Sequence, residues 1–600
     1  MSNRLFIGDM MMKYSSRIAA ALLAIALAMP TLLTGQDAPR PQKKLIATGW
    51  DKVDSARLVR NIREMETRPF GGVFMAMSGT REDGRTCQLR NVQTRDPWKR
   101  EWFAKQLQEL RGVELRTFTD NFLSIGANPG NVDWFDDEGW ENVVEHWAIA
   151  AWLAKQGRFR GLLFDPEPYH KPYAQFRHSA QEQAAAHTFE QYAAKARERG
   201  RQVMSAMARE FPDLTLFCYF MNSANAAAAR AKKPQHVLRG GHYGLYPAFI
   251  DGWLDAAPAT ITFVDGCESA YRYSSRLQYL ASSVAIKGIC QRLVASENRA
   301  KYRAQVQVSF GIYLDAYWNP ENTKWERWRV DCGDAAPVEK LLDNVSAALE
   351  SCDEYVWIYG EKFRWWPTPN QRVFPQSWSE ALPNCDLALL CATDPDAMAR
   401  RVLRNAEENN QPLPNLTKNG AFGDGSVAKD VKQAADDWVK AGAPAGWTTW
   451  QTTDDKGVFA HDRKLGAAKA TGVVRGGCFI QTIEGVAPGE VYAITARTKT
   501  TGGSTTSIRI RWQTPEGKWT REGQDVFILP EAPGTEGWHR LFGTVLIPDS
   551  AGRLVILLSI SGQTGTTDTA WFDDVQAFRI ADRDLFSATP VRCDLEQTGE

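Results

Sequence analysis

Two carboxylic side chains, Asp165 and Glu167, lie two residues apart in the run FDPEPY that ends at Tyr169. Alternate residues of a strand point to the same face, so we expect these two carboxyl groups to point together. Neighbouring carboxylates raise each other's affinity for protons, which suits one of them to general acid and base chemistry. We therefore predict Glu167 as a general acid or base with Asp165 as its modulator. A helix N-cap is the structural alternative for this motif.

Further carboxylates follow other short apolar runs and could supply a second catalytic group: Glu268, Asp265 and Glu361. The residues alone leave the choice among the three open. Aromatic and polar side chains lie in the same positions, and the predicted substrate-binding residues are Trp50, Asp51, Asn121, Tyr169, Asn222, His242, Tyr243, Tyr313, Asp315, Trp357, Arg364 and Trp365. A protonated acid, a second carboxylate and flat aromatic faces are what cleavage of a glycosidic bond requires.

Eight short β-rich runs alternate with amphipathic stretches in the first two thirds of the chain. The runs are Leu45–Asp51, Gly72–Met77, Leu115–Phe122, Gly161–Tyr169, Leu214–Met221, Ile261–Glu268, Val306–Asp315 and Tyr355–Glu361. Between them, Asp54–Thr67 and Phe189–Phe211 have the pattern of amphipathic helices. Eight strand–helix repeats predict an α/β fold, a (β/α)8 TIM barrel, whose active site lies at the carboxyl ends of the strands. An open doubly wound sheet is disfavoured because no glycine-rich phosphate loop follows the first strand.

The composition and the hydrophobic pattern of the sequence change near residue 405, where the polar stretch NAEENNQPLP begins. Short alternating runs follow it, as expected of an all-β jelly-roll sandwich: Cys478–Ile483, Val491–Thr498, Ser507–Gln513, His539–Ile547, Leu554–Ser561 and Ala570–Phe578. A helix is considered only around Val427–Val439. We expect a signal peptide (1–38), a catalytic barrel (39–404), a linker (405–414), the sandwich (415–580) and a C-terminal tail (581–600). We expect a chain cut after Pro414 to retain a folded, active barrel.

The sandwich half carries four motifs: NLTKNGAFGDG (Asn415–Gly425), GWTTW (Gly446–Trp450), GEVYAITARTK and AWFDDVQAF. With these it resembles carbohydrate-binding modules of the family 4/9 jelly-roll type. The resemblance implies sugar binding or packing against an enzyme. It also implies a structural calcium ion held by Asp573 or Asp574, although Gly423 stands where such modules often have Glu. No cofactor is expected for catalysis.

The first half resembles the broad superfamily of (β/α)8 glycoside hydrolases in its layout. In many of these enzymes an acid at the end of the fourth strand is catalytic, which implies that role for Glu167. The partner lies on the sixth strand in some of them, which favours Glu268 or Asp265, whereas geometry across the barrel favours Glu361. The Asp-x-Glu pair also resembles families in which the acetamido group of the substrate is the nucleophile.

Charge and targeting signals narrow the function classes. Lys and Arg together number 71, as do Asp and Glu, so nothing in the net charge favours a nucleic-acid partner. Lys13 and Arg17 precede the apolar run Ile18–Met29, which predicts a signal peptide and a secreted or periplasmic protein without a membrane span. The ten cysteines include no CxxC pair, which argues against zinc fingers, and Cys385–Cys391 and Cys332–Cys352 are the disulfides considered.

These observations predict an exported glycoside hydrolase that acts on a polysaccharide or oligosaccharide. The first alternative is a non-catalytic glycan-binding or scaffold protein. A polysaccharide lyase is the other, with Tyr169, His242 and Arg364 as its candidate residues. It is disfavoured because an acid-rich site would repel an anionic substrate. No motif indicates the oligomeric state.

Overall fold

The computed structural model describes residues 43–130, 132–169, 174–426, 443–520, 525–532 and 537–592. The predicted signal peptide and the helix considered around Val427–Val439 lie outside the described residues. No helix among the described residues is long and apolar enough to span a membrane.

A parallel sheet curves into a nearly closed barrel in the first part of the described chain. Its strands are β1 (Lys44–Gly49), β2 (Gly72–Met75), β5 (Phe122–Gly126), β6 (Gly161–Asp165), β7 (Thr215–Cys218), β8 (Thr262–Asp265), β9 (Val306–Val308), β10 (Phe310–Tyr313) and β11 (Tyr355–Gly360), in the spatial order β10-β11-β1-β2-β5-β6-β7-β8-β9. Only Ser309 separates β9, which pairs with β8, from β10, which pairs with β11. The predicted seventh strand is therefore interrupted, and eight predicted strands correspond to nine segments.

The third predicted strand, Leu115–Phe122, is wrong apart from its last residue. The strand at this position is β5, which begins where the predicted one ends. Asp120 precedes β5, and its carboxylate contacts Lys44 Nζ and accepts a 2.7 Å hydrogen bond from Tyr355 Oη. Lys44 and Tyr355 begin β1 and β11, so Asp120 lies at the amino-terminal end of the barrel. The error arose because Gly126 and Pro129 make the real strand look like a turn.

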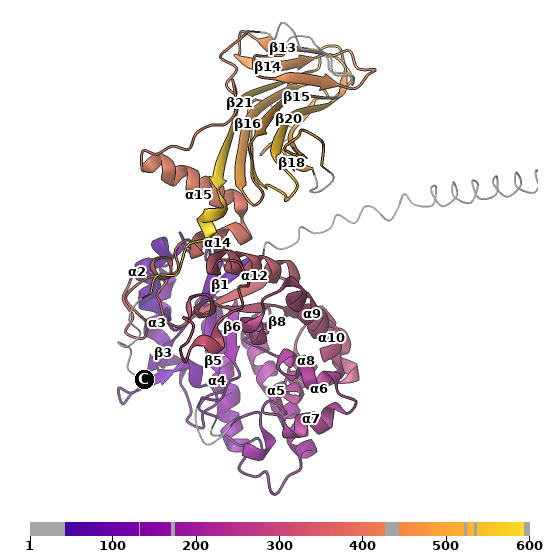
Figure 1. Ribbon diagram of the computed structural model, residues 1–600. Coiled ribbons are helices and arrows are strands. Elements are labelled where there is room, and N and C mark those ends of the chain that lie inside the picture. The colour runs from indigo at the N-terminus through magenta and orange to yellow at the C-terminus, as the bar shows by residue number, and fades with distance from the viewer. Residues whose placement is uncertain are drawn as a thin grey trace, which may run out of the picture. The chain divides into compact units, whose positions relative to one another are not determined.

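Helices surround the strands (Figure 1). The described helices of this part are α2 (Ser55–Met65), α3 (Ala104–Arg111), α4 (Asp137–Gln156), α5 (Phe189–Glu210), α6 (Ala226–Arg230), α7 (Pro234–Gly240), α8 (Tyr246–Ala256), α9 (Arg276–Lys287), α10 (Arg299–Gln305), α11 (Asp315–Trp318), α12 (Pro337–Ser351), α13 (Trp378–Ala381), α14 (Cys385–Thr393) and α15 (Pro395–Glu408). Helices α2 and α5 confirm the two predicted from sequence. Thr188 and Gln191 form a capping box that fixes the start of α5.

Alternation along the strands divides the apolar side chains into two layers. Leu162 and Phe164 of β6 belong to the large core beneath the helices, as the two-residue period of a strand requires of two residues on one face. The intervening Leu163 joins an inner cluster with Phe74, Phe217 and other residues of neighbouring strands. Large aromatic side chains thus fill the barrel interior, and the face that carries Leu163 continues to Asp165 at the carboxyl end.

The second part of the chain contains two antiparallel five-stranded sheets, β12-β15-β20-β17-β18 and β13-β14-β21-β16-β19. Their strands are β12 (Thr448–Gln451), β13 (Val458–Asp462), β14 (Ala467–Thr471), β15 (Val474–Glu484), β16 (Val491–Thr501), β17 (Thr505–Gln513), β18 (Val526–Ile528), β19 (His539–Leu546), β20 (Arg553–Gln563) and β21 (Thr569–Ala581). All six predicted strands are confirmed. One apolar cluster that includes Phe479, Ile494 and Leu558 links both sheets.

Contacts also join the sandwich to the helices that follow β11. Met398 and Ala399 of α15 are buried against Val491 and Phe542 of the sandwich. Beyond β21 the chain returns to the first part, where Val591 N donates to Ala381 O at 2.8 Å. Residues 405–408 of the predicted linker are part of α15. A chain cut after Pro414 would lose these contacts, and whether it keeps a folded, active barrel stays a prediction.

The nine described cysteines are free thiols, so the disulfides considered from sequence are wrong. Cys385 and Cys391 both lie on α14, where residues six apart do not share a face.

Candidate active site

Asp165 ends β6, and Glu167 and Tyr169 follow it at the carboxyl end of the barrel. The Asp165 carboxylate accepts a hydrogen bond from Glu167 N at 3.0 Å, and Tyr169 Oη donates to Glu167 Oε2 at 2.6 Å. Asn128, which follows β5, holds this loop from the side: its Nδ2 donates to Glu167 O at 3.1 Å and its Oδ1 accepts from Tyr169 N at 2.9 Å. The motif is therefore fixed by its neighbours and does not cap a helix among the described residues.

Glu268 and Glu361 reach the same end of the barrel from other strands. Glu268 follows β8 and begins a short 3-10 helix after Cys267, whose φ of 44° turns the chain. Glu361 follows β11, and its Oε2 accepts a hydrogen bond from Tyr313 Oη at 2.9 Å. Both side chains are partly exposed, so they remain open to a ligand.

Burial raises the pKa of three of these carboxyl groups. The pKa of Glu268 rises to about 9, through burial and then through the like charges of Glu167 and Asp165. Burial, with the charge of Glu167, raises the pKa of Asp165 to about 7. Burial and the charge of Asp315 raise the pKa of Glu361 to about 7. The acids therefore share one space, and Glu268 keeps its proton at neutral pH.

Aromatic side chains form the walls between the acids. Tyr271 stacks on Tyr313 at 5.2 Å between ring centroids, and Tyr219 stacks on Trp357 at 4.5 Å. Trp50 Nε1 donates to Tyr359 Oη at 3.1 Å, which holds the indole at the rim. The Trp50 and Tyr169 side chains are 46% and 60% exposed, so these two rings offer open faces for a flat apolar ligand surface.

Asp265 and Asp315 do not face the open site, which corrects their predicted catalytic and substrate-binding roles. Asp265 is fully buried and accepts hydrogen bonds from Met221 N at 3.0 Å and Ser223 N at 2.9 Å. Asp315 is also fully buried, accepts from Glu361 N at 2.8 Å and pairs with Lys362 Nζ at 3.0 Å. Both carboxylates hold the loops that carry the site, and neither is free to meet a substrate.

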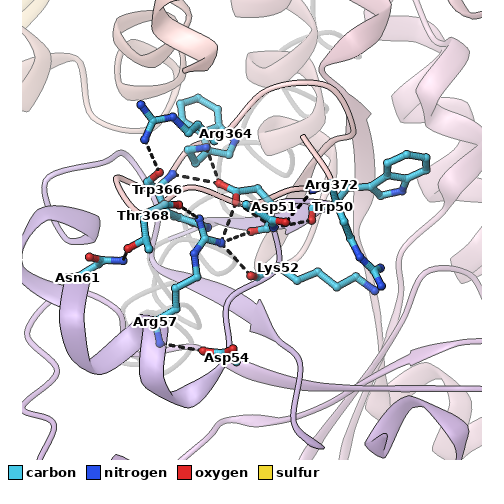
Figure 2. Close-up of polar contacts among 12 residues, drawn as sticks. Trp50, Asp51, Lys52, Asp54, Arg57, Asn61, Arg364, Trp366, Thr368 and Arg372 are labelled. Atoms are coloured by element: carbon cyan, nitrogen blue, oxygen red, sulfur yellow. Dashed lines mark hydrogen bonds and ion pairs between the residues drawn. The ribbon is translucent and has the colours of Figure 1, made fainter. Parts of the chain in front are cut away.

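Asp51, Arg364 and Trp365 belong to a polar network that ties the loop after β1 to the loop after β11 (Figure 2). Asp51 pairs with Arg57 at 2.7 Å and accepts hydrogen bonds from the backbone N–H groups of Trp365 and Trp366. Arg364 donates to backbone carbonyls, including Pro367 O at 2.6 Å. The polar atoms of Asp51 and Arg364 thus already hold the loops, and the Trp365 side chain is buried, so none of the three is placed to contact a substrate in this conformation.

The other predicted binding residues divide between the site and the core. Asn121 lies before β5, at the amino-terminal end, where its Oδ1 accepts from Val73 N at 3.0 Å. Asn222 and Trp357 are fully buried, which excludes direct substrate contact in this conformation. The Tyr243 ring packs edge-on against Phe220 with 4.8 Å between centroids, and burial, followed by the charges of Glu167 and Glu268, raises its pKa. His242 beside it is exposed.

Sequence reasoning missed three residues at the site: Lys52, Tyr219 and Tyr359. Tyr219 Oη lies 2.8 Å from Thr48 Oγ1, and Tyr359 accepts the Trp50 indole hydrogen bond. Lys52 interacts with the charge of Asp165. Tyr359 and Trp357 alternate along β11, so the strand period could have indicated it. Lys52 carried no signal other than its position after the first strand.

Asp573 and Asp574, the predicted calcium ligands, lie on β21 and are held locally. Asp573 Oδ1 accepts from Asp574 N at 2.7 Å, and Asp574 Oδ1 accepts from Gln576 Nε2 at 3.0 Å. Across the described residues no group of three or more His, Cys, Asp or Glu side chains gathers as a metal site. Calcium also takes backbone carbonyl, amide and water oxygens, so calcium binding by Asp573 or Asp574 stays a prediction.

The chain matches no protein-family model and no curated protein. Its similarities to solved structures include glycoside hydrolases and carbohydrate-binding modules. One is the enzymatically active domain of tailspike protein 4 of bacteriophage CBA120 (17% identity, TM-score 0.21, 27% of this chain and 21% of that chain). A structure described as "CBM4 structure and function" has 24% identity and a TM-score of 0.19 over 27% of this chain and 97% of that chain. A Clostridium thermocellum xylanase 10B with CBM22-1 and GH10 modules has 16% identity and a TM-score of 0.18 over 22% of this chain and 26% of that chain. The chain thus spans about a quarter or less of the tailspike and xylanase chains.

Proposed function

We propose that the protein is an exported glycoside hydrolase that uses Glu167 and Glu268 as a catalytic pair at the carboxyl end of a (β/α)8 barrel. One observation carries this proposal. Glu268 has a pKa of about 9 and faces the charge of Glu167, which accepts a 2.6 Å hydrogen bond from Tyr169. One acid thus holds a proton while its partner accepts hydrogen bonds, as two-carboxylate hydrolysis requires.

In the proposed reaction Glu268 gives its proton to the glycosidic oxygen. The bond between the anomeric carbon and that oxygen breaks, and its electron pair goes to the leaving oxygen. The Glu167 carboxylate attacks the anomeric carbon or takes a proton from the water that does so. The sequence favoured Glu167 as the acid, but the raised pKa of Glu268 leads us to assign the proton to Glu268. Asp165 remains a modulator of Glu167, and Glu361 is a second candidate partner.

The exposed rings of Trp50 and Tyr169 support a carbohydrate as the substrate, because sugar rings stack on such faces. The same proposal includes export through the predicted signal peptide and a carbohydrate-binding role for the sandwich. A lyase is less well supported, because the Tyr169 hydroxyl donates a hydrogen bond to Glu167 Oε2 at 2.6 Å and so is not placed to act as a base.

The proposal is tested by incubating purified residues 39–600 with polysaccharides and aryl glycosides and measuring reducing ends. We expect Glu268→Gln to lose about a hundredfold or more in kcat on substrates with poor leaving groups. Dinitrophenyl glycosides should largely restore the rate, because their leaving group needs no proton. Glu167→Gln should be inactive on both substrate types.

Glu101→Gln is the matched control, since Glu101 is exposed on a 3-10 helix outside the site. Full activity of both Glu167→Gln and Glu268→Gln would refute the assignment of the pair. Glycan binding without any bond cleavage across the panel would instead support the non-catalytic alternative.

A further inference from the structure

We propose that Lys52, Arg90 and Arg372 form a subsite for a negatively charged substituent of the glycan, a carboxylate or a sulfate group. The inference rests on the proposed function for the identity of the ligand as a saccharide. It adds the chemical class of substrate, which the catalytic pair leaves open.

Lys52 and Arg372 come from the two loops that the Asp51 network joins. Lys52 follows Asp51, and Val53 extends the sheet by pairing with Met75. Asn370 Nδ2 donates to Trp50 O at 3.2 Å, and its Oδ1 accepts from Arg372 N at 3.0 Å. Figure 2 shows both long side chains extending to the same side of this network, and their positive charges interact.

Arg90 lies in a 3-10 helix in the connection that follows β2, the strand on the other side of β1 from β11. Met77 O, just beyond β2, accepts a 2.9 Å hydrogen bond from Leu89 N and so fixes the start of the 3-10 helix Leu89–Asn91. A Cβ atom at Gly126 would lie 3.3 Å from Arg90 O and 3.4 Å from Asp165 O, so the backbones of Arg90 and Asp165 are close. The spatial order of the strands is β11-β1-β2-β5-β6. It therefore brings all three cations to the side that carries Asp165 at the open carboxyl end of the barrel, called the mouth below.

None of the three cations forms an ion pair within the part of the chain that the structure describes. Neighbouring charges in the same loops do pair, as Asp51 with Arg57 and Asp315 with Lys362. Burial and the positive charge of Arg90 lower the pKa of Lys52, with Arg372 adding to the effect and Asp165 opposing it. Arg90 Nε does donate to the neutral Gln88 Oε1 at 3.0 Å. Like charges held together without an ion-pair partner are stabilised by an anion, and Arg and Lys bind carboxylate and sulfate oxygens well.

The carboxyl groups at the mouth do not exclude an anionic ligand by charge repulsion. With pKa values of about 9 for Glu268 and about 7 for Asp165 and Glu361, these groups are largely protonated near pH 6. Repulsion is then weaker than the sequence alone suggested. The argument that an acid-rich site excludes an anionic substrate is therefore weaker at this pH, where Glu167 is the carboxylate that the proposed reaction keeps charged.

The test measures binding of the full chain to uronic-acid oligosaccharides by titration calorimetry at pH 6, with sulfated oligosaccharides as a second arm. Carboxyl-reduced and desulfated forms of the same oligosaccharides are the neutral controls. We expect the charged form of at least one arm to bind about tenfold or more tightly than its neutral form, and its affinity to fall as salt rises. The arm that shows the preference identifies the anion as carboxylate or sulfate.

Lys52→Met and Arg372→Gln should each reduce this preference, and the double variant should abolish it. Lys105→Met, on the outer helix α3 with a side chain 81% exposed, is the matched control and should keep it. Equal affinity for charged and neutral forms in both arms, or no binding of any charged probe, would overturn the subsite. So would a preference that survives in the folded double variant.

The outcomes also separate this inference from the proposed function. Cleavage of neutral glycans without preference for charge would keep the hydrolase and reject the subsite. Preferential binding of charged oligosaccharides without cleavage would keep the subsite and reject the hydrolase.

Discussion

Tyr169 donates a 2.6 Å hydrogen bond from its hydroxyl to Oε2 of Glu167, while its side chain remains 60% exposed. Tyr169 thus contacts Glu167, the proposed nucleophile or base, through its hydroxyl. It also presents an open aromatic face at the mouth. Asn128 fixes the backbone of both residues, so the pair is held in place before any ligand arrives.

We expect Tyr169→Phe to lower kcat about tenfold or more with little change in KM, because a hydrogen bond to a charged group contributes about 1.5–3 kcal/mol. Tyr169→Ala should also raise KM, since it removes the stacking face. Steady-state kinetics on one aryl glycoside separates the two effects. Tyr492→Phe is the matched control, because Tyr492 donates at 2.8 Å to Glu490, also two residues away, in the sandwich. Equal kinetics for Tyr169→Phe and the control would contradict the role.

The raised pKa of Glu268, about 9, makes the stability of the protein depend on pH. Between the ordinary Glu pKa of the unfolded chain and about 9, the folded state binds more protons, so the free energy of unfolding falls as pH rises through this range. Glu268→Gln should weaken this fall and raise Tm relative to the parent at pH 8, with little difference at pH 4. Melting curves at both pH values test this. A Tm difference between parent and variant that does not change from pH 4 to pH 8 would argue against a Glu268 side chain that stays protonated at neutral pH.

Asp265 offers a contrast between structural and catalytic carboxylates. Asp265→Asn replaces one acceptor oxygen with a donor that faces a backbone N–H, so we expect a loss of about 1–3 kcal/mol in the free energy of unfolding. Urea denaturation measures this, with exposed Asp213→Asn as the control. The folded variant should keep kcat within a few-fold of the parent. A loss of about a hundredfold at unchanged stability would return Asp265 to the list of catalytic residues.

The contacts of α15 predict the result of truncation. Removing all residues after Pro414 would expose Met398 and Ala399 and delete the hydrogen bond between Val591 N and Ala381 O. We expect a lower Tm and reduced solubility of the remaining barrel, because exposed apolar surface promotes association. Calorimetry of this truncation beside one that lacks only residues 583–600 would divide the effect between the sandwich and the tail. An unchanged Tm in both would support an independent barrel.

The sequence identified the Asp165–Glu167 motif and the other two partly exposed acids, Glu268 and Glu361. Asp165 ends a buried strand and Glu361 directly follows one, so the two-residue period of a strand makes the direction of these side chains readable. Glu268 lies beyond the turn at Cys267, and only its place after a strand indicated it. The same period separated Leu162 and Phe164 from the interior Leu163. The period gave the wrong position for Asn121, because Gly126 and Pro129 are typical of turns and the strand β5 (Phe122–Gly126) was therefore placed too early in the chain.

Other roles depended on neighbours that lie far away in the chain. Asp265, Asp315 and Arg364 have the residue types of an active site, but backbone groups or a buried lysine use their polar atoms. Burial, which only the packed structure creates, raises the pKa of Glu268 and so led us to move the proton from Glu167 to Glu268 in the proposed mechanism.

The sequence by itself thus determined the alternation of strands and helices, the strands of the sandwich and the acids that follow the strands, since these depend on local periodicity. Only the tertiary structure decided which acids remain open to a ligand. It also brought Lys52, Arg90 and Arg372 to one side of the open end of the barrel, because pairing of β1 with β2 and β11 joins segments up to 311 residues apart in the chain. Solvation and charge interactions across such distances are set by packing, and no local pattern encodes them.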